Sequence, residues 1–467
     1  MKQRIIFSVV LLFYLPVAVA QNVPYHQNLQ TYVSIDSTMG YYLPAFDTVK
    51  SLAIFVNYPS GALNSTAWPH GTKTLPSFAA KLLSQNITEM EPDSSLTAYL
   101  LEASLGRLKF LGQTYPEVVQ LDHNMEYYNT NGQLGGIVYE VLDKVNQSGL
   151  VNWYELDTWS KVNGKWRKQP DGVVDNIMII FRDDPTNFGY NWTGSGGGIA
   201  ALLCKDYQVN EHLVIRGGSM GSGLISNSGA EFFPRHFRLL KHELAHYFTL
   251  DHYAGLNGFY GPDFTNHGAW GLAAAHGSSS ICVNSWDRDK LGWARFLVNT
   301  DASTAGDTVI VLHDFITTGE AARIKLPYVN GEYFLLEYHN NTGWYDAVDG
   351  TQNGLYILHQ SGQPENHLDM EEADGRWDFI VSDSIEFWEG CCGKQPMVKR
   401  LDQNPFLGFG DHDDLRMLKY ENRDDAVLTQ ENMQRAFGFC HRRRRAYYSL
   451  QRRWERWIYQ RKREKYF

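Results

Sequence analysis

Two histidines and a glutamate follow the order His-Glu-x-x-His within residues 241–252, whose sequence is KHELAHYFTLDH. Residues four apart lie on one face of an α-helix, so His242 and His246 can present two imidazoles to one metal ion. Glu243 is next to them, where a carboxylate can hold and deprotonate a metal-bound water. His252 follows as a third imidazole. Three histidine ligands leave a fourth position for water, so the pattern predicts a catalytic zinc site.

The surrounding residues predict the helix that must position this motif. Pro234 suits a first helical turn, where the missing N–H would have no helical partner anyway. Apolar residues recur at spacings of three and four and predict a core-facing stripe: Phe237, Leu240, Leu244 and Phe248. A different face, expected to look into the site, holds Leu239, His242, His246 and Thr249. The alternative is a buried helix whose histidines only make hydrogen bonds, but the full constellation favours the metal site.

Strands and helices alternate in the chain before residue 300. Buried strands are predicted at 51–58 and 175–181, helices at 96–108 and 135–145, and a short strand at 200–204. Glycine-rich loops are predicted at 194–198 and 217–223. The second lacks the residue order G-x-x-x-x-G-K-[ST] of a phosphate-binding loop. This alternation predicts a mixed α/β (α+β) catalytic domain over residues 49–300.

The pattern changes after residue 300 to short apolar or alternating runs between Gly, Asn and Pro turns. Such runs are typical of strands in a β-rich fold. They predict a smaller β-rich domain over residues 301–434, with strands at 308–313, 322–326, 332–339 and 354–359.

The first twenty residues have the pattern of a secretory signal peptide. Lys2 and Arg4 precede an apolar run at 5–15, and Ala-Val-Ala at 18–20 forms a cleavage site. Residues 21–48 are interpreted as a lead-in or short pro-segment. Since no later segment offers about 18 uninterrupted apolar residues, no membrane span is predicted. The expected localisation is therefore secreted and extracellular, as a soluble mature protein.

The charge is unevenly distributed along the chain. The whole chain carries −10, and residues 435–467 hold twelve Lys or Arg against two Glu, so residues 1–434 carry −20. An acidic body of this kind argues against nucleic acid as a partner. The basic tail, 435–467, is either a surface-binding arm or non-native sequence. The abrupt change of composition at its start favours non-native sequence.

A series of ordered motifs resembles the M6 family of secreted metallopeptidases, the immune inhibitor A group, from about residue 51 to residue 375. Besides the zinc motif, the matching stretches are 51–58, EASLG at 102–106, DGVVDN at 171–176, GAWGL at 268–272, LGW at 291–293, EYFLLE at 332–337, GLYILH at 354–359 and ADG at 373–375. The resemblance implies a zincin-type catalytic domain and a zinc-dependent endopeptidase, a hydrolase acting on protein or peptide substrates. It implies His242, His246 and His252 as zinc ligands and Glu243 as the catalytic base and acid.

Three positions depart from the family pattern. Thr249 replaces a glycine of the turn after the helix, His252 replaces a frequent aspartate, and Ala273 replaces a methionine beneath the metal. A threonine with positive φ would be strained, unless the turn is rebuilt with negative φ. These departures keep open the alternative of a catalytically impaired relative that acts as a binding protein. Asp171 and Asp175 match the family's calcium loops thinly, so Ca²⁺ is a second candidate cofactor.

Overall fold

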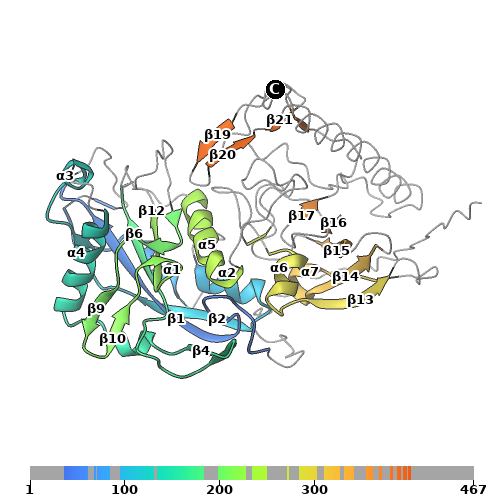
Figure 1. The fold of residues 1–467 in the computed structure, drawn as a ribbon, viewed down its shortest axis with the longest axis horizontal. Helices are drawn as coiled ribbons and strands as arrows, with labels where there is room; N and C mark the ends of the chain where they lie inside the picture. Colours follow the sequence, from blue (N-terminus) through green and yellow to red (C-terminus); the bar gives the residue numbers. More distant parts are fainter. Residues whose placement is uncertain are drawn as a thin grey trace, which may run out of the picture.

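The computed structural model describes residues 36–60, 68–69, 71–84, 95–130, 134–183, 198–227, 234–249, 271–272, 283–301, 310–326, 331–340, 354–360, 368–370, 379–381, 387–390, 393–396 and 398–400. The predicted signal peptide, the basic tail, His252 and Ala273 lie outside these residues. The described chain is mixed α/β, as predicted (Figure 1). Among the described residues, no helix has the length and apolar composition needed to cross a membrane.

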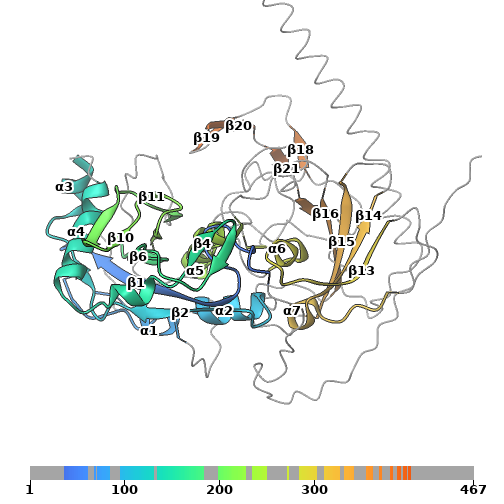
Figure 2. The ribbon, with the colours of Figure 1, turned by 60° about the horizontal axis from the view of Figure 1, so that its bottom comes forward.

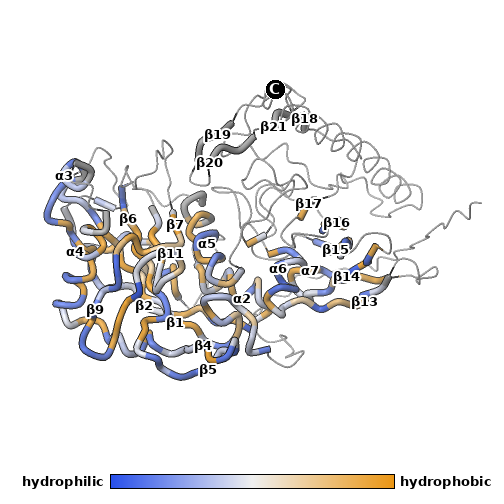
Figure 3. Tube along the Cα trace, viewed as in Figure 1, coloured by the Kyte–Doolittle hydropathy of each residue, from blue (hydrophilic) through white to orange (hydrophobic). Residues whose placement is uncertain are grey.

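The larger sheet is mostly parallel and ends in one antiparallel strand. Its strands are β1 (Asp47–Asn57), β2 (Leu108–Thr114), β3 (Val119–Gln120), β6 (Ile177–Phe181), β7 (Gly198–Ile199) and β12 (Gly223–Asn227). The order is β2-β1-β6-β12-β7, with β3 also pairing with β1, and β7 runs antiparallel to β12. β6 and residues 52–56 of β1 are runs of apolar residues, as expected for strands buried on both faces, and Figure 3 shows this concentration at the centre of the sheet.

Helices cover both faces of this sheet because β1 alternates its side chains between two cores. Val49, Ala53 and Phe55 join a core with α2 (Leu96–Ala103) and α5 (Pro234–Thr249). Leu52, Ile54 and Val56 join the opposite core with α4 (Leu134–Gln147). Shorter helices are α1 (Ala79–Leu82), α3 (Met125–Thr130) and the 3-10 helix η2 (Trp153–Leu156).

The first predicted helix, 96–108, is too long by about one turn. α2 ends at Ala103, and Leu108 already begins β2. The reason is local: Leu105 and Gly106 have φ of +54° and +75°, a left-handed conformation that an α-helix does not continue through. The second predicted loop is also partly wrong, because Gly223 is the first residue of β12.

Three two-stranded sheets flank the larger one. They are β4 (Ser160–Val162) with β5 (Lys165–Arg167), β8 (Ala201–Leu202) with β11 (Gly218–Ser219), and β9 (Tyr207–Asn210) with β10 (Leu213–Ile215). The predicted strand at 200–204 is confirmed only in part, since β8 covers Ala201–Leu202 alone. The hairpin β4–β5 turns at Asn163-Gly164, whose φ values of +51° and +75° are those that a tight hairpin needs.

A second sheet follows, with order β13-β14-β15-β16-β17. Its elements are α6 (Ser285–Lys290), β13 (Arg295–Asp301), α7 (Phe315–Thr318), β14 (Glu320–Lys325), β15 (Tyr333–His339), β16 (Gly354–Gln360) and β17 (Leu368–Met370). One face of this sheet belongs to the same core as α2 and α5, and Figures 1 and 2 show the two sheets side by side with α6 between them. Two further strand pairs are β18 (Phe379–Val381) with β21 (Val398–Arg400) and β19 (Phe387–Gly390) with β20 (Gly393–Pro396).

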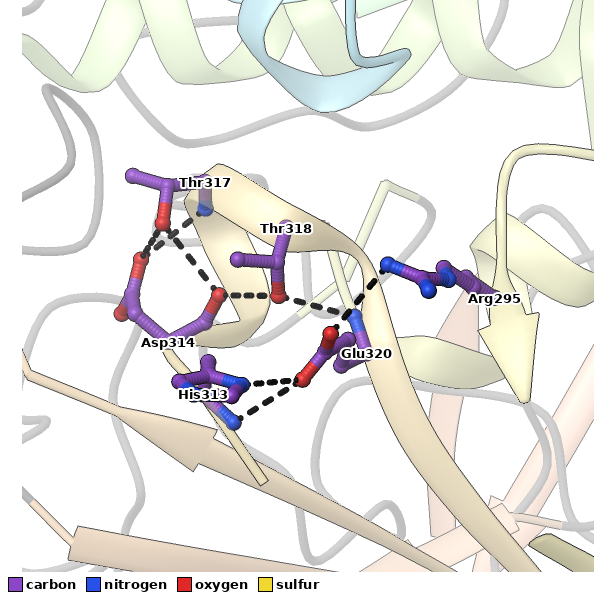
Figure 4. Close-up of polar contacts among 6 residues, drawn as sticks. All are labelled: Arg295, His313, Asp314, Thr317, Thr318 and Glu320. Atoms are coloured by element: carbon purple, nitrogen blue, oxygen red, sulfur yellow. Dashed lines mark hydrogen bonds and ion pairs between the residues drawn. The ribbon is translucent and has the colours of Figure 1, made fainter. Parts of the chain in front are cut away.

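The predicted strands at 322–326, 332–339 and 354–359 are confirmed as β14, β15 and β16. The predicted strand at 308–313 is not, because its described residues, 310–313, lie outside any strand. The sheet's edge is instead β13, which pairs in parallel with β14. The chain returns through α7, where the Asp314 side chain accepts hydrogen bonds from the backbone N–H and hydroxyl of Thr317, while Glu320 binds Arg295 and His313 (Figure 4).

Candidate active site

Helix α5 brings three of the four predicted site residues together. It begins at Pro234, as predicted, and its apolar stripe of Phe237, Leu240, Leu244 and Phe248 is buried in the core against α2 and the sheet. This packing fixes the rotation of the helix, and His242, Glu243 and His246 are buried with it. The fourth predicted residue, His252, lies outside the described residues.

The two imidazoles have a separation that suits one zinc ion. The ring centroids of His242 and His246 are 4.9 Å apart, and the ring planes meet at 85°. Two imidazoles that share a tetrahedral zinc, each through a Zn–N bond of ~2.1 Å, have centroids about 5 Å apart. The pair therefore fits the ion that the motif predicts. Within the described residues, no set of three or more His, Cys, Asp or Glu side chains converges as a metal site.

Glu243 is held against the edge of the larger sheet. The backbone N–H of Ala200, between β7 and β8, makes a hydrogen bond with its carboxylate. Burial raises the pKa of Glu243 to about 8, and this hydrogen bond lowers it in part. A metal cation nearby would favour the ionised form further. A buried carboxylate with a pKa near neutrality is suited to taking a proton from water and giving it back.

Gly198 in β7 makes the close approach between the sheet edge and Glu243 possible. A Cβ atom at this position would lie 2.7 Å from the Glu243 Cγ and 3.1 Å from the Leu239 Cγ. Any larger residue would therefore displace the carboxylate. The sequence predicted that Gly198 lies in a loop. It did not predict that Gly198 and Ala200 belong to the site. The signal was the glycine run ending at 198, but its partner is 45 residues away and becomes apparent only in the folded chain.

The end of α5 differs from the strained turn considered from sequence. Thr249 is the last residue of the helix, and its hydroxyl donates to the Ala245 carbonyl oxygen at 3.1 Å. Among the described residues, a few other than glycine have a positive φ, and Thr249 is not one of them. The strain of a left-handed threonine therefore does not arise at Thr249 itself.

The acidic residues at the candidate calcium position accept hydrogen bonds from backbone N–H groups. Asp175 accepts hydrogen bonds from the N–H groups of Thr158 and Trp159, and Asp157 accepts from those of Asp171 and the glycine after it. Burial, together with the charges of Asp157 and Asp171, raises the pKa of Asp175 to about 8. The carboxylates thus tie two loop segments together, and calcium binding stays a prediction.

Comparison with known proteins adds no relative: no family model matches the chain, and no curated protein matches it. The functional argument therefore rests on the motif and on the geometry of α5 and the adjoining sheet edge.

Proposed function

We propose that this protein is a secreted zinc-dependent endopeptidase of the M6 type with a zincin-type catalytic domain. The observation that carries the proposal is the buried arrangement on α5, where two imidazoles with zinc-compatible spacing lie next to a buried glutamate. His242, His246 and His252 would hold the ion. The mixed α/β fold and the ordered sequence motifs support this assignment, and the signal-like residues 1–20 support export.

The chain's own groups supply binding, orientation and proton transfer. Bound zinc would lower the pKa of a water and polarise a substrate carbonyl. Glu243 takes the proton of the attacking water on its carboxylate and passes it to the leaving amine. The Ala200 N–H and the surface of Gly198 fix the position of that carboxylate, so it needs little reorganisation during the reaction.

The test is the substitution Glu243→Gln, which keeps the size of the side chain and removes the base. We expect zinc content to be retained and casein hydrolysis to fall by about 10²–10⁴-fold, the usual contribution of acid–base catalysis. Glu211→Gln is the matched control, because the Glu211 side chain is 83% exposed. Casein cleavage by the Glu243→Gln variant at the parent's rate would contradict the mechanism.

A second outcome separates the enzyme from its rival class. If the parent protein binds zinc with the expected ligands but hydrolyses neither casein nor a set of fluorogenic peptides, the chain is a binding protein that retains the metal site. Activity in the parent that is lost in the Glu243→Gln variant identifies the enzyme.

A further inference from the structure

One row of side chains on helix α5 faces β7 and β12 of the larger sheet (Figure 1). It consists of Leu239, Glu243 and Tyr247, which lie on one side of the helix because they are four residues apart. Leu239 and Glu243 pack against Gly198 of β7, where an added Cβ atom would lie 3.1 Å from the first Cγ and 2.7 Å from the second. Tyr247 is fully buried, and its hydroxyl donates to the carbonyl oxygen of Gly223 in β12. The row that carries the candidate base is thus attached to the sheet at two strands.

The Gly223 carbonyl group points toward the side of β12 on which β7 lies. The Ile177 N–H of β6 donates to the Ser222 oxygen at 2.8 Å. Successive carbonyl groups of a strand point to opposite sides, so the next oxygen, that of Gly223, points away from β6. β7 pairs with residues 225–226, so Gly223 lies beyond this pairing. The Tyr247 hydroxyl therefore supplies a donor to a carbonyl group at the point where the β7 pairing has ended.

Glu243 is connected to the same part of the sheet through Ala200. The Ala200 N–H makes a hydrogen bond with the Glu243 carboxylate, and the Ala200 carbonyl oxygen accepts from the Met220 N–H at 2.9 Å. The chain then runs three residues from Met220 to Gly223, which accepts from Tyr247. One turn of α5 leads back from Tyr247 to Glu243. These five residues therefore form a closed loop of contacts, the anchoring ring.

The side of the anchoring ring between Met220 and Gly223 has a well-defined backbone. The Ser222 N–H donates to the Arg216 oxygen at 2.8 Å, and the Arg216 N–H donates to the Ser222 hydroxyl oxygen at 2.9 Å. A Cβ atom at Gly221 would lie 2.4 Å from the same Arg216 oxygen. Met220 has a φ of +53°, in the left-handed region that residues other than glycine rarely adopt. Such a conformation persists where the surrounding structure holds it, so this segment is a firm support for the helix.

We propose that Tyr247 is a positioning residue for Glu243. Its hydroxyl closes the anchoring ring, which fixes the height and rotation of α5 against the sheet edge where the Ala200 N–H meets the carboxylate. Without the hydroxyl the ring is open at β12, and Glu243 can move relative to that N–H. Tyr247 acts through Glu243 and takes no part in the chemistry itself. This inference rests on the proposed function.

The test is Tyr247→Phe, which keeps the buried ring and removes the hydroxyl. We expect kcat for a fluorogenic peptide to fall by roughly tenfold, because a shift of the base well below 1 Å costs less than the about 10²-fold of a full ångström. KM and zinc affinity should stay within about twofold, because the proton-transfer group is displaced and no ligand is removed. Thermal melting checks that the variant is folded.

A second measurement needs neither zinc nor turnover. Amide hydrogen exchange over residues 198–202, followed by mass spectrometry, should speed up by about fivefold or more in Tyr247→Phe, because the Ala200 N–H loses a fixed acceptor. The matched control is Tyr207→Phe. Tyr207 is also buried, and its hydroxyl donates to Asp143 at 2.9 Å, outside the anchoring ring. The control should lower the melting temperature without changing kcat or this exchange.

A double-mutant cycle separates positioning from general stability. In the Glu243→Gln background, Tyr247→Phe should change the residual rate by less than about twofold, because the base that it positions is already gone. A loss in that background as large as in the parent would overturn the inference. Unchanged kcat in Tyr247→Phe, or unchanged exchange over residues 198–202, would overturn it as well.

The proposed function and this inference fail in different measurements. A parent protein that binds no zinc or hydrolyses no peptide refutes the proposed function. The anchoring ring is then tested by the exchange over residues 198–202 in the parent, Tyr247→Phe and Tyr207→Phe proteins. Faster exchange in Tyr247→Phe alone supports the ring, and equal exchange in all three refutes it.

Discussion

Gly198→Ala is expected to disable the candidate base without touching a metal ligand. The added Cβ would lie 2.7 Å from the Glu243 Cγ. Carbon atoms in contact normally lie about 3.5–4.0 Å apart, so the Glu243 side chain must shift by roughly 1 Å. A misplacement of that size can cost a catalytic site about 10²-fold in rate. We therefore expect kcat/KM for peptide hydrolysis to fall by about 10²-fold with zinc content unchanged.

The assay is cleavage of a fluorogenic peptide, with zinc measured by mass spectrometry and folding by thermal melting. Gly71→Ala is the control, because a Cβ atom there would meet no described atom within 4 Å, although its φ of +65° costs some stability. Loss of activity in Gly71→Ala as well would show a general effect of stability. A Gly198→Ala variant that is folded, zinc-loaded and fully active would refute the placement of Glu243 as the working base.

Two further predictions concern stability. Burial raises the pKa of Asp175 from 3.8 to about 8, so the folded protein retains a proton that the unfolded chain releases. This carboxyl favours folding most below pH ~4 and progressively less up to pH ~8, so the stability of the parent relative to Asp175→Asn should fall over that interval, by ~3 kcal/mol if half of the shift is realised. Urea unfolding at both pH values measures it, and a pH-independent difference would contradict it. Asp314→Ala should lower the free energy of unfolding by about 2 kcal/mol, because the N–H groups of Thr317 and Asn340 lose their acceptor. An Asp314→Ala variant as stable as the parent would show that this cap contributes nothing.

Elements with a strong local pattern were predictable from sequence. α5 begins at Pro234 and buries the expected stripe, and β1 and β6 follow from their apolar runs. Each of these apolar patterns extends over enough residues that a single exception does not change the predicted element. The end of α2 was missed because Leu105 adopts a left-handed conformation that nothing in its residue type favours. β13 was missed because its parallel partner follows only after an intervening helix.

The candidate site likewise has some residues that the sequence predicts and others that only the folded chain reveals. His242, Glu243 and His246 are read from spacing alone, since one helix positions all three. The contact of Glu243 with Gly198 and Ala200 joins a helix to a strand that is distant in sequence, so no spacing rule reveals it. The hydrogen bonds that residues 41–43 donate to the carbonyl oxygens of residues 247–248 are still less local. Backbone N–H groups make these bonds, so the residue types carry no signature of them.

Metal stoichiometry tests the central claim most directly. Native mass spectrometry of the purified protein should show one zinc ion per chain, and the single substitutions His242→Ala, His246→Ala and His252→Ala should each remove it or weaken its binding strongly. His123→Ala should leave the zinc in place, because the His123 ring lies against Tyr127 and Tyr128, and Tyr128 belongs to the core on the other face of the larger sheet from α5. A parent protein that binds no zinc, or a His246→Ala variant that keeps it with unchanged affinity, would contradict the account.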